Sequence, residues 1–224
     1  MKLMVGRPCG WQAEHPDVGT YLSQLMLELS EEYPRDLEVV QVVQTGARIM
    51  VARNEIVKSF LDGDSQYLLM VDPDMQPDLE AGHRFFWTSL NFLETAKNGI
   101  VGAPACSGPP HYNVNVFWVR WDGLIHHVTQ NQASRMRGIE RVAAVGTGVM
   151  LIPREIFSKL EPPWFEDEYL DQFSTRLKMS QDVAFSMKCN RAGVPVFVNW
   201  SCWAGHWKQH LVGRPNGISL PVVL

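Results

Sequence analysis

The feature that most constrains the fold of this chain is the stretch Tyr67-Leu-Leu-Met-Val-Asp-Pro-Asp-Met75, a short apolar run that ends on two aspartates. A run of this length suits a strand buried on both faces, as in parallel sheets. Side chains alternate along a strand, so we expect Asp72 and Asp74 to point the same way, with Pro73 holding Asp72 extended. Carboxylates at the carboxyl end of such a strand face the crevice where open α/β sheets bind ligands. The pair therefore predicts a site for Mg²⁺ or Mn²⁺ carrying a polyphosphate.

A second pair, Asp62-Gly-Asp64, shows that the spacing alone is not specific. It lies between a predicted helix and the Tyr67 strand, where Gly and Asp favour a solvated turn. Only the strand context separates the two pairs, and a coincidental turn at the strand end remains the alternative for Asp72 and Asp74.

Composition places the chain among ordinary globular proteins. Apolar residues make up 46% of its 224 residues and charged residues 20%, which excludes a largely disordered chain and suits one α/β domain. No apolar run has the length of a membrane span or of a signal peptide. The net charge of −4 gives no overall basic field that would attract nucleic acid, although a local basic surface stays open.

The cysteines indicate a reducing compartment. They show no metal-ligand spacing, and scattered free thiols are typical of the cytosol. With no secretion signal, we expect a cytoplasmic protein, in the host cytoplasm if it is viral. The four residues are Cys9, Cys106, Cys189 and Cys202.

Hydrophobic periodicity alternates between strand and helix over the first hundred residues. Strands are predicted over residues 2–6, 38–43, 67–71 and 100–103, and helices over 18–32, 47–61 and 78–96. This alternation indicates βαβ units around a parallel sheet.

The second half has a different pattern. Residues 113–120 and 124–128 predict a β-hairpin, and 149–152 and 194–199 predict strands. Helices are predicted from Pro153 to 160 and from Ser180, a good N-cap, to Gly193. The polar segment 131–141 is predicted to be a mobile loop, and the tail after Gly205 has little periodicity. We find no linker or repeat, so one domain is expected.

The elements and motifs in this order resemble the GT-A fold of small glycosyltransferases, in the family-2-like group common in phage and bacterial genomes. The resemblance spans Val5 to about Lys208. It rests on Pro8-Cys9-Gly10, Val51-Ala-Arg-Asn54, Val71-Asp-Pro-Asp-Met75, the run Gly146–Phe157, Ser180-Gln-Asp182 and Gly205-His206. It implies an α/β, Rossmann-like single domain over 1–224 with a mostly parallel central sheet, helices on both faces and a smaller acceptor-side β element. Residues 1–103 would form the nucleotide-binding half and 104–224 the acceptor-binding half.

The resemblance also implies roles for the nucleotide-binding residues. The loop after the first strand would cup the base and ribose, and a polar pair at the second helix would contact the nucleotide. These residues are Pro8, Cys9 and Gly10 in the loop, and Arg53 and Asn54 on the helix. A plain turn at Gly10 and a surface charge at Arg53 are the alternatives.

Further implied roles concern the metal and the sugar. His206 would complete the shell of Asp72 and Asp74 around a divalent ion bridging the phosphates, which favours Mn²⁺ over Mg²⁺. Lys208 would reach the diphosphate. Gly146, Thr147 and Gly148 would form the floor under the sugar.

Asp182 would be the general base that takes the proton from the acceptor hydroxyl. The family usually has Glu-Asp where this chain has Gln181-Asp182, so one acidic partner is missing. The alternative is that Asp182 only favours the helix N-terminus electrostatically.

The predicted function is metal-dependent transfer of a sugar from a nucleoside diphosphate, such as a UDP-sugar, to an acceptor hydroxyl. Two alternatives remain: a phosphatase of the haloacid-dehalogenase type, in which the first aspartate is the nucleophile, and a non-catalytic nucleotide-sugar-binding protein. One acceptor class is a hydroxymethylated base in phage DNA; glycans, lipid-linked sugars and small molecules also stay open. The basic and aromatic residues behind the DNA hypothesis are Arg120, Arg135, Arg137, Arg141, Arg154, Trp121, Trp164 and Trp207.

Overall fold

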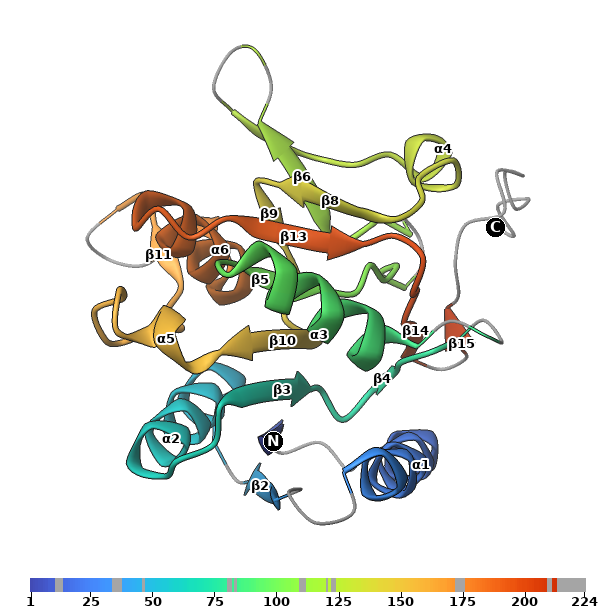
Figure 1. The fold of residues 1–224 in the computed structure, drawn as a ribbon. Coiled ribbons are helices and arrows are strands. Elements are labelled where there is room, and N and C mark those ends of the chain that lie inside the picture. The colour runs from blue at the N-terminus through green and yellow to red at the C-terminus, as the bar shows by residue number, and fades with distance from the viewer. Residues whose placement is uncertain are drawn as a thin grey trace.

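A seven-stranded mixed sheet forms the centre of the protein (Figure 1). The computed structural model describes residues 1–10, 14–33, 38–45, 47–79, 82, 84–108, 112–119, 121, 124–171, 176–208 and 211–212. The strand order is β2 (Glu38–Thr45), β1 (Lys2–Gly10), β3 (Tyr67–Val71), β10 (Val149–Pro153), β5 (Ile100–Gly102), β13 (Val196–Asn199) and β8 (Ile139–Val142).

The sheet is mostly parallel, as expected. Strands β2, β1 and β3 run together, and β5 and β13 share their direction. Strand β10 runs the opposite way between β3 and β5, and β8 runs antiparallel to β13. The strands β10, β13 and β8 come from the second half of the chain, so both halves build one sheet.

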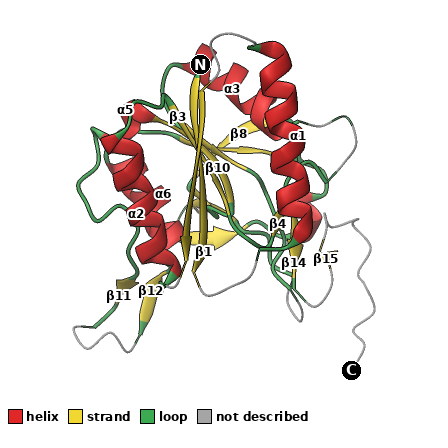
Figure 2. Cartoon of the chain, turned by 90° about the horizontal axis from the view of Figure 1, so that it is seen from below, coloured by secondary structure: helices red, strands yellow, loops and turns green. Residues whose placement is uncertain are grey.

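Helices cover both faces of the sheet (Figure 2). Helices α1 (Pro16–Glu32) and α3 (Phe85–Ala96) lie on one face, and α2 (Ile49–Asp62), α5 (Arg154–Phe157) and α6 (Gln181–Arg191) lie on the other. The alternation of side chains in β3 explains the two layers. Leu68 and Met70 join the core beneath α2, whereas Leu69 and Val71 join the core beneath α1 and α3.

Among the described residues, three smaller sheets accompany the central one. The predicted hairpin consists of β6 (Val116–Val119) and β7 (Ile125–His127), which are antiparallel, and β9 (Ala144–Val145) extends it. A second sheet joins β4 (Met75–Gln76), β14 (Gly205–Trp207) and β15 (Leu211–Val212). The third pairs β11 (Glu168–Tyr169) with β12 (Leu177–Met179).

The helix predicted from residue 78 begins later, at Phe85. Asp78 instead has a left-handed backbone, with φ of 55°. Its carboxylate accepts a hydrogen bond of 2.6 Å from the Phe85 N–H. An aspartate that the sequence places inside the helix therefore caps it from outside.

The prediction of a mobile loop over 131–141 is wrong. A short helix, α4 (Gln130–Ala133), begins at a capping box formed by Thr129 and Gln132. Residues 139–142 then form β8 at the sheet edge. Glu140 and Arg141 are exposed in this strand, and these two consecutive charged residues hid it from the periodicity.

Two other expectations change. In the tail after Gly205, the described residues 205–207 and 211–212 form β14 and β15, because the β14 backbone pairs with β4 directly after the Asp-Pro-Asp turn. Pro8, Cys9 and Gly10 belong to β1 and pair with β2 across a bulge, rather than forming a loop beyond it. Within the described residues, no helix combines the length and apolar character needed to cross a membrane.

Candidate functional site

Asp72 is held by a buried arginine from α2. Arg53 lies on the same helical stripe as Ile56, Val57 and Phe60, and its side chain is 3% exposed. Asp72 follows Val71 and so faces the α2 side of the sheet. The Arg53 Nη2 donates to both carboxylate oxygens, at 2.7 and 2.6 Å. The alternative of a surface charge at Arg53 is therefore wrong.

Asp74 contacts two basic side chains from the C-terminal segment. The Nε2 of His206 lies 3.2 Å from Asp74 Oδ2, and Lys208 Nζ donates to the same oxygen at 2.9 Å. The His206 Nδ1 lies 3.0 Å from the Cys106 carbonyl oxygen, which orients the ring. Sequence positions more than 130 residues apart thus meet at this carboxylate.

The pKa values of the two carboxyls shift in opposite directions. Burial raises the pKa of Asp72; the Arg53 guanidinium counteracts this only in part, and the charges of Asp74 and Asp182 raise it further. Burial also opposes ionisation of Asp74, but hydrogen bonds from His206 and Lys208 outweigh it and lower the pKa of Asp74 to about 2. Asp74 is therefore the more firmly ionised of the pair.

Backbone bonds fix the turn that carries both aspartates. The Asp72 N–H donates to the Gly148 carbonyl at 2.8 Å, continuing the β3–β10 ladder. The His15 N–H donates to Pro73 O at 2.8 Å, and the Trp207 N–H donates to Asp74 O at 2.7 Å. The rings of His15 and Trp207 stack with centroids 4.0 Å apart. No motif or periodicity in the sequence indicates these contacts.

The predicted metal ligands come together only in part. Among the described residues, no group of three or more His, Cys, Asp and Glu side chains is arranged to hold a metal ion. Asp74 and His206 are adjacent, whereas Asp72 is bonded to Arg53. The donor set still fits a divalent ion, because Mg²⁺ sites commonly use one or two carboxylates and take the remaining ligands from substrate phosphates and water. The bond from His206 to the Cys106 carbonyl is also typical of a ligating histidine.

The glycines of the 146–148 segment pack against protein. A Cβ on Gly146 would lie 2.5 Å from the Asn115 side chain, and one on Gly148 would lie 3.0 Å from Met75. These contacts explain both glycines without a sugar. Thr147 between them is buried, and its hydroxyl has no hydrogen-bond partner among the described residues.

The Asn54 side chain links α2 to the loop that carries Trp164 and Phe165. Its side-chain amide donates to the carbonyls of Met50 and Phe165, and its oxygen accepts from the N–H groups of Trp164 and Phe165. These four bonds fill the capacity of the amide. A direct contact with a nucleotide stays a prediction and would require some of them to break.

Asp182 lies in the first turn of α6, close enough to Asp72 for its charge to raise the Asp72 pKa. Ser180 is the N-cap residue, but its hydroxyl donates to Asp182 Oδ1 instead of capping the helix. The cap comes from Asp167, whose carboxylate accepts from the Gln181 N–H at 2.8 Å. Asp167, which the motifs did not reveal, thus fixes the turn that carries Asp182.

Two of the residues behind the DNA hypothesis, Arg154 and Trp164, are engaged within the fold. The Arg154 guanidinium donates to carbonyls at the C-terminal end of α2, those of Phe60, Leu61 and Gly63. Trp164 packs edge-on against Phe157 in the core. Arg135, Arg137 and Arg141 are exposed, Trp121 is exposed, and Arg120 lies outside the described residues.

Comparison with solved structures finds similar folds. The crystal structure of A197 from STIV is 16% identical, with a TM-score of 0.61 over 96% of this chain and 94% of that chain. That likeness shows the fold alone. UTP-bound UGPase from Acinetobacter baumannii is 11% identical, with a TM-score of 0.43 over 92% of this chain and 66% of that chain, too low to carry an argument. No family model matches the chain, and no curated protein matches it significantly.

Proposed function

We propose that this protein is a glycosyltransferase that moves a sugar from a nucleoside-diphosphate donor, such as a UDP-sugar, to an acceptor hydroxyl. The observation that carries the proposal is the meeting of two carboxylates and three basic groups at the end of β3. Asp72 pairs with Arg53, and Asp74 pairs with His206 and Lys208. The end of a central parallel strand is where α/β sheets bind ligands.

In this proposal the chain's own groups bind the donor and move one proton. Asp74 and His206 would hold a Mn²⁺ or Mg²⁺ ion, which supplies charge compensation for the departing diphosphate. Lys208 would contact the same phosphates. Asp182 accepts the proton of the attacking hydroxyl. The Ser180 hydroxyl and the Val183 N–H both donate hydrogen bonds to Oδ1 of Asp182. The other oxygen, Oδ2, would therefore be the proton acceptor.

The contacts of Asp72 weaken the phosphatase alternative. A nucleophilic carboxylate needs one oxygen free to attack, yet both oxygens of Asp72 are bonded to Arg53. A non-catalytic nucleotide-sugar-binding protein would make the same contacts with the donor and would differ only in lacking turnover. Kinetic measurements must therefore distinguish it from a glycosyltransferase.

The test is release of free nucleoside diphosphate from a panel of sugar nucleotides, with and without Mn²⁺. EDTA should abolish release and added Mn²⁺ should restore it, whereas full activity in EDTA would exclude the metal assignment. Release of inorganic phosphate would indicate a phosphatase. Donor binding without turnover on any acceptor would indicate a binding protein.

Asp74→Asn has a matched control in the second Asp-x-Asp pair. Asp74→Asn should weaken donor binding as well as turnover, because the diphosphate needs the ion that Asp74 holds. Asp64 is an exposed carboxylate paired with Lys2, so Asp64→Asn should leave both unchanged. Equal losses in the two variants would contradict a specific role for Asp74.

The acceptor remains a separate proposal. A hydroxymethylated base in DNA is tested by incubating duplex DNA containing 5-hydroxymethylpyrimidines with mixed sugar nucleotides. A sugar mass on the digested nucleoside would support this acceptor, and its absence together with undetectable DNA affinity at low salt would exclude it.

A further inference from the structure

The β6–β7 hairpin presents three large apolar side chains to solvent. Val119 is 56% exposed, Trp121 92% and Leu124 61%. They lie within six residues of one another, beside the end of β6 that points away from the central sheet in Figure 1. Single exposed apolar residues need no explanation, but a group at one end of a hairpin marks an interaction site.

The opposite end of the hairpin is anchored beside the candidate site. The Gly146 N–H donates to Asn115 O, and the Asn115 N–H donates to Ala105 O, next to the residue whose carbonyl contacts His206. The Val128 N–H closes the hairpin on Val116 O. The hairpin therefore leads outward from the site to the apolar tip.

A cavity of about 560 Å³ lies along the same hairpin. Trp118 and Val119 line it from β6, Arg141 and Val142 from β8, and Met187 from α6. The cavity is largely open to solvent. The wall is mainly apolar and includes Arg141, an exposed cation, so it suits an amphipathic ligand with an anionic group.

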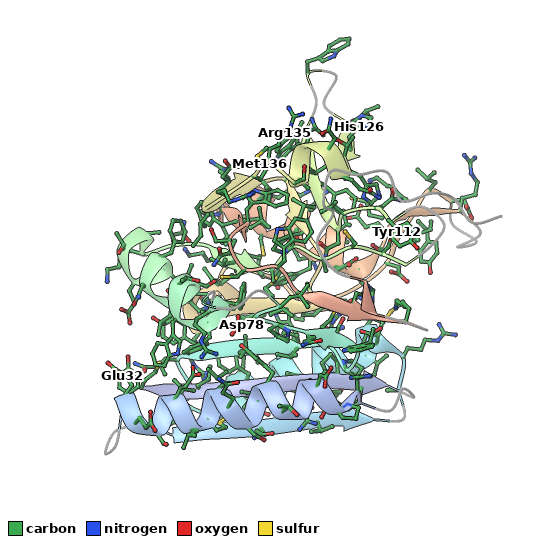
Figure 3. The ribbon with its side chains drawn as sticks, turned by 90° about the vertical axis from the view of Figure 1, so that its right-hand side faces the viewer. Glu32, Asp78, Tyr112, His126, Arg135 and Met136 are labelled. Carbon is green, nitrogen blue, oxygen red and sulfur yellow. The ribbon has the colours of Figure 1, made fainter. Side chains whose placement is uncertain are left out.

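The segment around the hairpin, residues 113–145, carries a net positive charge, whereas the whole chain is negative. Residues 113–145 contain four arginines and only two acidic residues, although the chain has a net charge of −4. In Figure 3, His126 and Arg135 both lie at the end of the molecule away from α1. Positive charge beside exposed aromatic and aliphatic side chains is typical of surfaces that bind anionic membranes.

We propose that the tip of the β6–β7 hairpin and the adjoining cavity dock on an anionic phospholipid surface. Val119, Trp121 and Leu124 enter the interface between headgroups and acyl chains, where tryptophan is favoured. Arg141 and its neighbours meet the lipid phosphates. Nucleic acid would satisfy the arginines but would leave the aliphatic side chains in water, so the apolar tip favours lipid.

The test is co-sedimentation of the full chain with vesicles, without any sugar donor, so that its result is independent of glycosyl transfer. Binding should be clear with phosphatidylcholine mixed with phosphatidylglycerol and weak with phosphatidylcholine alone. Trp121→Ser combined with Val119→Ser should abolish binding. Arg141→Gln should weaken binding to the anionic vesicles about fivefold.

Matched controls remove similar groups elsewhere. Leu27 is 60% exposed on α1, and Lys58 is exposed on α2, so Leu27→Ser and Lys58→Gln should bind like the wild type. The proposal would be overturned if the control variants lost vesicle binding to the same extent, or if the wild type bound neither kind of vesicle. Binding to duplex DNA that needs Arg141 but not Trp121, with no vesicle binding, would overturn it in favour of nucleic acid.

Discussion

Arg53 occupies a position on α2 where an apolar side chain would normally pack. Its Nε and Nη1 are buried with no hydrogen-bond partner among the described residues, so only the bonds from Nη2 to Asp72 repay its desolvation. The ring of Phe165 lies 5.7 Å from the guanidinium carbon and adds a cation–π contact. An incompletely satisfied buried cation is a cost that function explains better than stability does.

Removing the Arg53 guanidinium should destabilise the fold through Asp72. Arg53→Met leaves a buried carboxylate without its partner and should lower the free energy of unfolding by about 3 kcal/mol. Urea unfolding measures the loss. Adding Asp72→Asn should restore much of it, because the two residues act as a pair; additive losses would contradict the coupling.

Asp182 is the residue on which the chemistry depends. Asp182→Asn should lower turnover about 10²-fold or more while UDP affinity stays near that of the wild type. Steady-state kinetics with calorimetric binding measures both. Asp17 is also an acid in a first helical turn, so Asp17→Asn is the control for a helix-end effect. Normal turnover in Asp182→Asn would leave Asp182 with only that electrostatic role.

At the scale of elements, the N-terminus of α6 is positioned from outside the helix. Asp167→Ala removes the acceptor for the Gln181 N–H and should cost about 1 kcal/mol of stability. Turnover should fall further than this cost explains, because the turn bearing Asp182 loosens. Asp167→Asn keeps an acceptor oxygen and should restore both quantities in thermal unfolding and kinetic assays. Failure of that rescue would refute a positioning role.

Elements were predictable where one periodicity dominates. The α1 stripe and the apolar run of β3 are local signals, and both elements lie where the periodicity placed them. Strand β8 and strand β14 are defined by their pairing partners, β13 and β4, and pairing across the chain leaves little trace in a short segment. The same limit hid His15 and Asp167, whose roles depend on backbone groups far away in sequence.

At the scale of the whole molecule, the ionisation of Asp74 makes the stability of the fold depend on pH. Its pKa is lowered from 3.8 to about 2, so its ionised form stabilises the fold. That contribution is complete above the ordinary pKa and disappears as the pH falls through the folded value. The difference in unfolding free energy between wild type and Asp74→Asn should therefore be constant above about pH 5 and shrink below pH 4. Urea titrations across this range measure it, and a difference that grows toward low pH would contradict the sign.

The position of β10 also has a consequence for synthesis on the ribosome. Strand β5 pairs with β10 and β13, both of which are translated later, and β3 likewise waits for β10 on one edge. A nascent chain whose first 103 residues have left the exit tunnel should therefore expose unpaired strand edges to chaperones and be cleaved rapidly in pulse proteolysis. Protection should appear only once β10 and β13 have left the exit tunnel. Protection already at residue 103 would mean that the first half acquires its structure without the later strands.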